Sequence, residues 1–236
     1  MAEITFPTAL WALASGILPA LLWLWFWLKE DTLRPEPREL ILAAFVGGML
    51  AIAPALFLER LTHSIIGGGV AMIIAWAAIE ELVKYGSAYI VAFRHRCIGG
   101  VVCLDEPIDP VMYMITAALG FAAGENALFL LTPLARGDTL ASIVTGDLRF
   151  LGATVLHTVA SGAVGTAMGL AFSKSPRVKK IALYLGLCTA IGLHALFNIS
   201  IIQGQADTIF ITFSILWIIA IILLMVFEKI KSLPVR

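Results

Sequence analysis

The chain has 236 residues, of which 60% are hydrophobic and 14% charged, and its mean hydropathy is +0.96. This composition excludes an ordinary soluble domain and predicts an integral membrane protein. The formal net charge is zero, which gives no indication of nucleic-acid binding, and the three cysteines (Cys97, Cys103 and Cys188) form neither a disulfide framework nor a CxxC metal site.

Apolar stretches long enough to cross a bilayer follow one another along the whole chain. A membrane-spanning helix needs roughly 20 mostly apolar residues, and on this criterion we expect an all-α, polytopic membrane helix bundle with about seven transmembrane helices, forming a single domain over residues 1–236. The expected spans are residues 6–28, 39–59, 65–93, 108–132, 148–172, 181–202 and 208–227. The first is expected to be retained, because its apolar run is too long for a signal peptide and Lys29 follows it.

The basic residues between the spans are distributed unequally. Twelve Lys and Arg residues follow the first, third, fifth and seventh spans, whereas only Arg60 and Arg136 lie in the other loops. The twelve are Lys29, Arg34, Arg38, Arg94, Arg96, Lys174, Arg177, Lys179, Lys180, Lys229, Lys231 and Arg236. Because cytoplasmic loops are enriched in basic residues, we expect a multi-pass protein of the cell membrane with its N-terminus outside and its C-terminus in the cytoplasm.

Charged and polar side chains occur inside four consecutive spans. A charge at the centre of a span costs about 2.5–3.5 kcal/mol and normally faces a partner or a wet cavity. The third span contains Glu80, Glu81 and Lys84, the fourth Glu125 and Asn126, the fifth Arg149 and His157, and the sixth His194 and Asn198. Several of these pairs are three or four residues apart and therefore share a helix face. The pattern predicts polar active-site stripes on helices three to six that meet in the middle to outer part of the membrane.

Carboxylates and imidazoles that converge in this way are suited to general acid–base catalysis or to holding a catalytic metal. A proton- or cation-coupled transporter also uses intramembrane Glu and His residues, and it is the alternative class. The small size of the chain, its odd number of spans without obvious inverted repeats, and the concentration of polar residues on one block of four helices favour an enzyme.

Four short motifs in the same order extend this interpretation to a family. The sequence "EELVK" begins at Glu80, "FAAGE" begins at Phe121 and is followed by Asn126, His157 stands alone on its helix, and "HALFN" begins at His194. These motifs resemble the EExxK, FxxxE, H and HxxxN/D signatures of the PrsW intramembrane proteases, which are relatives of the CAAX prenyl proteases and the Abi proteins.

A longer stretch, "DEPIDPVMYMITAALGFAAGEN" from Asp105 to Asn126, also resembles a segment of that family. It departs from the family pattern where Pro110 follows Asp109, and where Met114 and Ala118 stand in place of glycines. These differences concern the conformation of the loop more than the chemistry, and they leave the role of the loop around Asp109 open.

The resemblance covers about residues 75 to 200 and implies a peptidase domain whose motif-bearing core spans about residues 65–202. The expected catalytic residues are Glu80, Glu81, Glu125, His157, His194 and Asn198, supported by Lys84 and Arg149. The implied substrate is a membrane-anchored protein, such as an anti-sigma factor cleaved on its extracytoplasmic side.

Two mechanisms remain open at this point. If one divalent metal such as zinc is present, its expected ligands are His157, His194 and one or more of Glu81 and Glu125, with Glu80 as the base. Without a metal, Glu80 or Glu125 would activate water with the help of His157, while His194 and Asn198 stabilise the oxyanion. The spacing does not choose between them, because the sequence has no HExxH motif and the expected ligands lie on separate helices.

Overall fold

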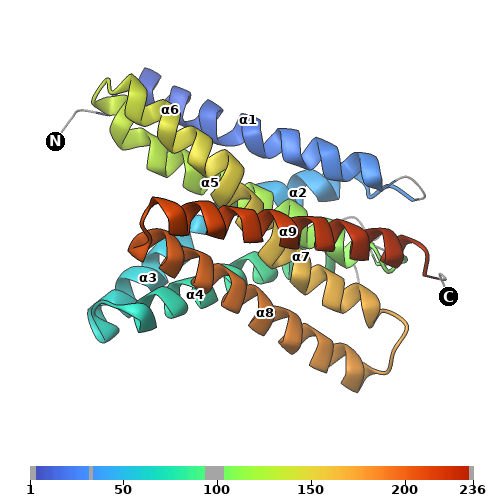
Figure 1. The fold of residues 1–236 in the computed structure, drawn as a ribbon. Helices are drawn as coiled ribbons and strands as arrows, with labels where there is room; N and C mark the ends of the chain where they lie inside the picture. Colours follow the sequence, from blue (N-terminus) through green and yellow to red (C-terminus); the bar gives the residue numbers. More distant parts are fainter. Residues whose placement is uncertain (1–3, 32–33, 94–103, 234–236) are drawn as a thin grey trace.

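The computed structural model describes residues 4–31, 34–93 and 104–233, and within these ranges it contains helices but no strands (Figure 1). The expected all-α fold is therefore confirmed. The elements are α1 (Phe6–Glu30), α2 (Arg38–Leu50), α3 (Ile52–Ile66), α4 (Val70–Ala88), the π-helix η1 (Tyr89–Phe93), α5 (Asp109–Ala135), α6 (Thr139–Leu148), the π-helix η2 (Arg149–Ala153), α7 (Thr154–Leu170), α8 (Pro176–Gln203) and α9 (Ala206–Lys231). Arg94, Arg96 and Arg236, which were counted for the orientation, lie outside the described residues, as do Cys97 and Cys103.

These elements form seven helical stretches in the described part of the chain. Six of them are long and apolar enough to cross a membrane, counting α2 with α3 and α6 with α7 as continuous stretches. The seventh, α4 with η1, has 24 residues and a length of roughly 36 Å, which exceeds the roughly 30 Å of a hydrocarbon core. It is long enough to span but less apolar than the other six, because its middle contains the charged residues Glu80, Glu81 and Lys84.

Three local features explain where the stretches break or begin. Pro54 has no N–H to donate to the carbonyl of Leu50, and the regular helix is interrupted at the end of α2. Gly67 and Gly69 have φ angles of 79° and 93°, so a turn ends α3 and the third span begins at Val70 instead of residue 65 as expected. The helix that contains the fifth span begins at Thr139 instead of residue 148, because the Asp138 side chain caps it by accepting the N–H of Ala141 at 2.9 Å.

Helix α5 forms the centre of the bundle. All of its residues from Asp109 to Ala123 are buried, and it packs against α1, α2 and α7. The contact with α2 is so close that a Cβ added at Gly120 would lie 1.9 Å from the Phe45 carbonyl oxygen, and one added at Gly48 would lie 2.0 Å from that of Ala117. Small residues therefore allow the helix backbones to touch, as is typical of membrane bundles.

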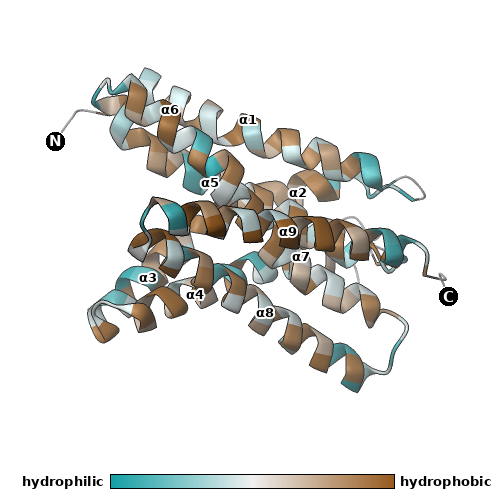
Figure 2. Ribbon diagram, viewed as in Figure 1, coloured by the Kyte–Doolittle hydropathy of each residue, from teal (hydrophilic) through white to brown (hydrophobic). Residues whose placement is uncertain are grey.

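The outer surface and the chain ends agree with a membrane location. Helix α9 is hydrophobic along most of its length, with hydrophilic residues near its two ends (Figure 2). Helices α1 and α9 run in the same direction, and the start of α1 and the end of α9 lie at opposite ends of the bundle (Figure 1). This arrangement fits an odd number of crossings.

The packing of α4, α5, α7 and α8 brings the four polar helices together. Helix α7 contacts both α5 and α8, and α4 contacts both α5 and α8. These four helices correspond to the third to sixth predicted spans, so the expected meeting of their polar stripes depends on this arrangement.

Candidate functional site

The polar residues of the four helices meet in one buried cluster near the middle of the bundle. Glu80 lies ten residues after the start of α4, or roughly 15 Å along the helix axis, which is about half the thickness of a hydrocarbon core. His157 comes from α7 and His194 from α8, and both side chains are 2% exposed. Helix packing thus places one carboxylate and two imidazoles at the same depth.

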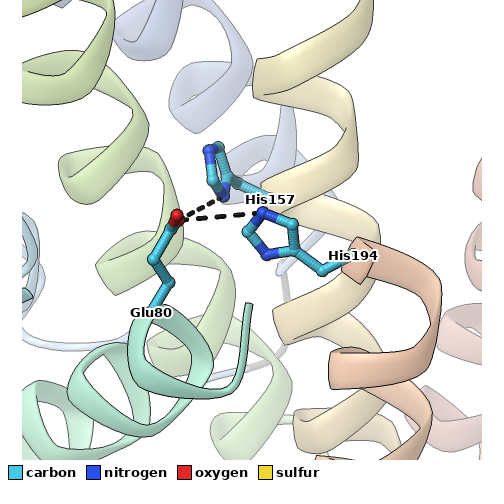
Figure 3. A group of neighbouring side chains, drawn as sticks. All are labelled: Glu80, His157 and His194. Carbon is cyan, nitrogen blue, oxygen red and sulfur yellow. Dashed lines mark ion pairs between the residues drawn. The ribbon is translucent and has the colours of Figure 1, made fainter. Parts of the chain in front are cut away.

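Glu80, His157 and His194 point toward one another (Figure 3). The Oε2 atom of Glu80 lies 4.0 Å from Nδ1 of His157 and 3.8 Å from Nε2 of His194, and one ligand atom from each residue lies within 4.8 Å of the other two. A tetrahedral zinc ion with ligands at about 2.0–2.1 Å would separate them by about 3.3 Å. Oε2 of Glu80 is buried and has no hydrogen bond within the described residues, so this donor set fits a divalent metal.

Each histidine is oriented by a second carboxylate through its other ring nitrogen. Nδ1–H of His194 donates to Oε1 of Glu81 at 2.8 Å, and Nε2–H of His157 donates to Oε2 of Glu125 at 2.9 Å. Because an ionised carboxylate only accepts hydrogen bonds, each bond fixes the tautomer and leaves the nitrogen that faces Glu80 unprotonated. Carboxylates commonly orient metal-binding histidines in this way.

Lys84 is a fully buried cation inside the cluster. Its Nζ atom lies 2.7 Å from Oε1 of Glu81, 2.7 Å from Nδ1 of His157 and 3.6 Å from Oε2 of Glu80. Ser161 on α7 donates to the other Glu81 oxygen at 2.9 Å. These bonds keep the buried charges of Glu81 and Lys84 paired, which a low-dielectric interior requires.

A π-helical turn brings Arg149 onto the same side as His157. Eight residues of regular helix would rotate Arg149 by roughly 80° from His157, whereas one extra residue in the π turn η2 reduces this to roughly 20°. Arg149 then donates to Oε2 of Glu125 at 2.6 Å and to Oδ1 of Asn126, whose amide donates to Thr154 at 3.0 Å. The guanidinium thus neutralises Glu125 and links α5 to α7.

The cluster is more open on the side of Glu125. The side chains of Glu125 and Arg149 are 22% and 13% exposed, whereas those of Glu80, Glu81 and Lys84 are 8% exposed or less. Glu125 lies ten residues before the end of α5. Glu125 and Arg149 are therefore the most exposed residues of the cluster, and we call this its open side.

Seven of the eight predicted site residues meet in this cluster. They are Glu80, Glu81, Lys84, Glu125, Arg149, His157 and His194. Asn198, one turn after His194, is half-buried and its side chain makes no hydrogen bond in the part of the chain that the structure describes. The grouping also differs from the expected ligand set: Glu80 is the carboxylate between the histidines, whereas Glu81 and Glu125 bind their outer nitrogens.

Two residues near the cluster were not predicted. Ser161 bonds to Glu81, but in the sequence it is one of many small residues on its helix and carries no separate signal. Glu59 on α3 interacts electrostatically with Glu125, His194 and Lys84. Its only signal was a carboxylate at the end of the second predicted span, where charged residues are common.

Comparison with known proteins places the chain in a family. The model of the PrsW family intramembrane metalloproteases matches residues 36–226. Protease PrsW of Oceanobacillus iheyensis is 28% identical over 218 residues, which are 89% of this chain and 92% of the relative. Protease PrsW of Geobacillus kaustophilus is 29% identical over 122 residues, half of this chain and 52% of the relative, so the match spans about half of that protein. No solved structure gives a significant match.

The family match covers α2 to α8 and most of α9, and so includes all four helices that contribute to the cluster. On this evidence the chain belongs to the PrsW family of intramembrane metalloproteases.

Proposed function

We propose that the chain is an intramembrane endopeptidase whose active site holds one divalent metal between Glu80, His157 and His194. The observation that carries this proposal is the buried Glu80 oxygen, which lacks a hydrogen bond within the described residues and faces one nitrogen of each histidine. Zinc suits this set, because imidazole and carboxylate are common zinc ligands. A bound zinc ion would polarise the scissile carbonyl and lower the pKa of a coordinated water.

We assign proton transfer to Glu125. Both of its hydrogen bonds use Oε2, which leaves Oε1 to accept a proton from the attacking water on the open side of the cluster. The O–H bond of that water breaks as its oxygen adds to the carbonyl carbon, and Glu125 then gives the proton to the nitrogen as the C–N bond breaks. Arg149 supports this role because its guanidinium, 2.6 Å from Oε2, pairs with the ionised carboxylate before the water attacks and favours return of the proton to the leaving nitrogen afterwards.

Asn198 and Glu81 are assigned supporting roles. The amide of Asn198 is not engaged by other side chains in the described residues, and we place it as a donor to the substrate carbonyl oxygen. Glu81 is fully buried between His194, Lys84 and Ser161, so it orients the site instead of touching substrate.

The substrate we propose is a membrane-anchored protein, with an anti-sigma factor as the expected kind, cleaved toward the extracytoplasmic side. The excess of basic residues after the odd-numbered spans supports an outside N-terminus. In that orientation the open side at Glu125 lies toward the outer end of α5. We also propose that the relation to the CAAX prenyl proteases holds, on the basis of the motifs at Glu80 and His194.

The test compares membrane-protein fragments, by mass spectrometry, in cells that make the wild-type protein or a variant. His157→Ala and His194→Ala should abolish the fragments and sharply lower the zinc content of the purified protein. His63→Ala is the matched control, because His63 is exposed and lies outside the cluster. If metal-free, chelator-treated wild type releases the same fragments at full rate, the metal proposal is wrong and a glutamate-activated water takes its place.

A further inference from the structure

The cation already inside the proposed metal site is Lys84. Its Nζ atom lies 2.7 Å from Nδ1 of His157, the ring nitrogen that faces Glu80 and His194. An ammonium group has only donors, so Nδ1 accepts this bond with its lone pair. The other nitrogen of His157 is engaged by Glu125.

An imidazole nitrogen has a single lone pair in the plane of the ring. That lone pair binds either an ammonium proton or a metal ion, but not both. We propose that Lys84 occupies the coordination position of His157 in the metal-free protein, so that a divalent cation has to displace its ammonium group in order to bind. This inference rests on the proposed metal site.

The surroundings of Lys84 allow such a displacement without leaving its charge unpaired. Oε1 of Glu81 is already 2.7 Å from Nζ, and the ring centroid of Phe121 is 4.7 Å away. The flexible stem of a lysine can therefore turn Nζ away from His157 while it keeps the bond to Glu81. In the metal-free state the same ammonium group stabilises Glu80 and Glu81, which would otherwise be two adjacent buried carboxylates.

The first experiment measures Co²⁺ affinity by visible absorption in purified wild type and Lys84→Met. We expect the variant to bind Co²⁺ at least tenfold more tightly, equivalent to about 1.4 kcal/mol, with the same absorption spectrum because the ligands are unchanged. Lys84→Leu should show the same gain in Co²⁺ affinity, and this result would exclude a contribution from the methionine sulfur. Insertion should not suffer, since both substitutions make the span more apolar.

Arg149→Met is the matched control. It also removes one cation from the cluster, but Arg149 contacts Glu125 and Asn126 instead of a proposed ligand. A general electrostatic effect would tighten binding equally in both variants and would overturn the inference. If Lys84 has to be displaced, Co²⁺ affinity should increase clearly more in Lys84→Met than in Arg149→Met.

A second measurement uses the wild-type chain and no substitution. Solid-state NMR on protein labelled with ¹⁵N at lysine Nζ and ¹³C in the histidine rings should detect a dipolar coupling between Lys84 and His157, and Zn²⁺ should abolish it. A coupling that persists in zinc-saturated protein contradicts displacement but leaves the metal site intact. If neither wild type nor the Lys84 variants bind Co²⁺ or Zn²⁺, both the metal site and this inference fail.

Discussion

The substitution Glu81→Gln tests our proposal that the site depends on a carboxylate that orients His194 without touching the substrate. The Glu81 side chain is fully buried and accepts hydrogen bonds from Lys84 at 2.7 Å, His194 at 2.8 Å and Ser161 at 2.9 Å. A glutamine amide has nearly the same shape, so its oxygen can still accept from Lys84 and His194. Its NH₂ group can donate to the Ser161 hydroxyl, which rotates to accept.

The main loss on Glu81→Gln is therefore the negative charge. Hydrogen bonds to charged groups contribute about 1.5–3 kcal/mol each, against about 1 kcal/mol for neutral ones. Weakening the bond that orients His194 should lower activity or metal affinity by about 10- to 100-fold, as is usual for carboxylates that orient metal-binding histidines. Glu81→Ala is less informative, because an unpaired buried Lys84 would cost about 3–5 kcal/mol of stability.

The assay is the rate of fragment release from a membrane-anchored substrate, normalised to the amount of folded enzyme in the membrane. Ser161→Ala is the control, because it removes one bond to the same carboxylate but keeps the charge and the bond to His194, and it should lower activity less than Glu81→Gln does. Wild-type activity in Glu81→Gln would refute the proposed role of Glu81. Equal losses in Glu81→Gln and Ser161→Ala would show that packing, not charge, matters there.

Two further predictions concern stability, measured as thermal unfolding in detergent. Burial, and then the neighbouring Asp109, raise the pKa of Glu36 from 4.5 to about 9. Between these two values the folded protein keeps a proton that the unfolded chain releases, so wild type should lose stability relative to Glu36→Gln as the pH rises from 5 to 8. A stability difference between the two proteins that does not change with pH would refute this. Gly120→Ala should destabilise the protein by about 1–3 kcal/mol or more, because its Cβ would lie 1.9 Å from the Phe45 carbonyl oxygen. Gly192→Ala is the control and should leave stability unchanged, because a Cβ there has no neighbour within 4 Å. Similar unfolding temperatures for the two variants would contradict the close packing of α2 and α5.

The helical fold and the gathering of polar residues were predictable because they depend on local properties of the sequence. Each span is recognised by its own apolar length, and a charge such as Glu80 or Lys84 inside a span costs too much to face lipid. Four consecutive helices with such residues leave few arrangements other than a shared polar interior. The all-α fold that followed from this reasoning is confirmed.

Details that depend on backbone geometry were less predictable. Hydropathy alone placed Gly67 and Gly69 inside a span, although their positive φ angles form the turn before α4. It also could not reveal the π turn at Arg149, where the Thr154 hydroxyl donates to the Arg149 carbonyl at 3.0 Å and the Arg149 side chain donates to Glu125 and Asn126 on α5.

The sequence could not show which carboxylate faces both histidines, for a related reason. Glu80 and Glu81 are adjacent on α4 and point in directions about 100° apart, so only the positions of α7 and α8 decide which of them faces both histidines. The structure places Glu80 between His157 and His194, and Glu81 behind His194.

The most direct test of the metal centre is X-ray absorption at the zinc edge of the purified, active protein. We predict scattering from two imidazole rings and carboxylate oxygen in the wild type, and from one imidazole in any zinc that remains bound to His194→Ala. Zinc bound without histidine scattering, or zinc retained in full after both His157 and His194 are replaced, would contradict a metal centre built from Glu80, His157 and His194.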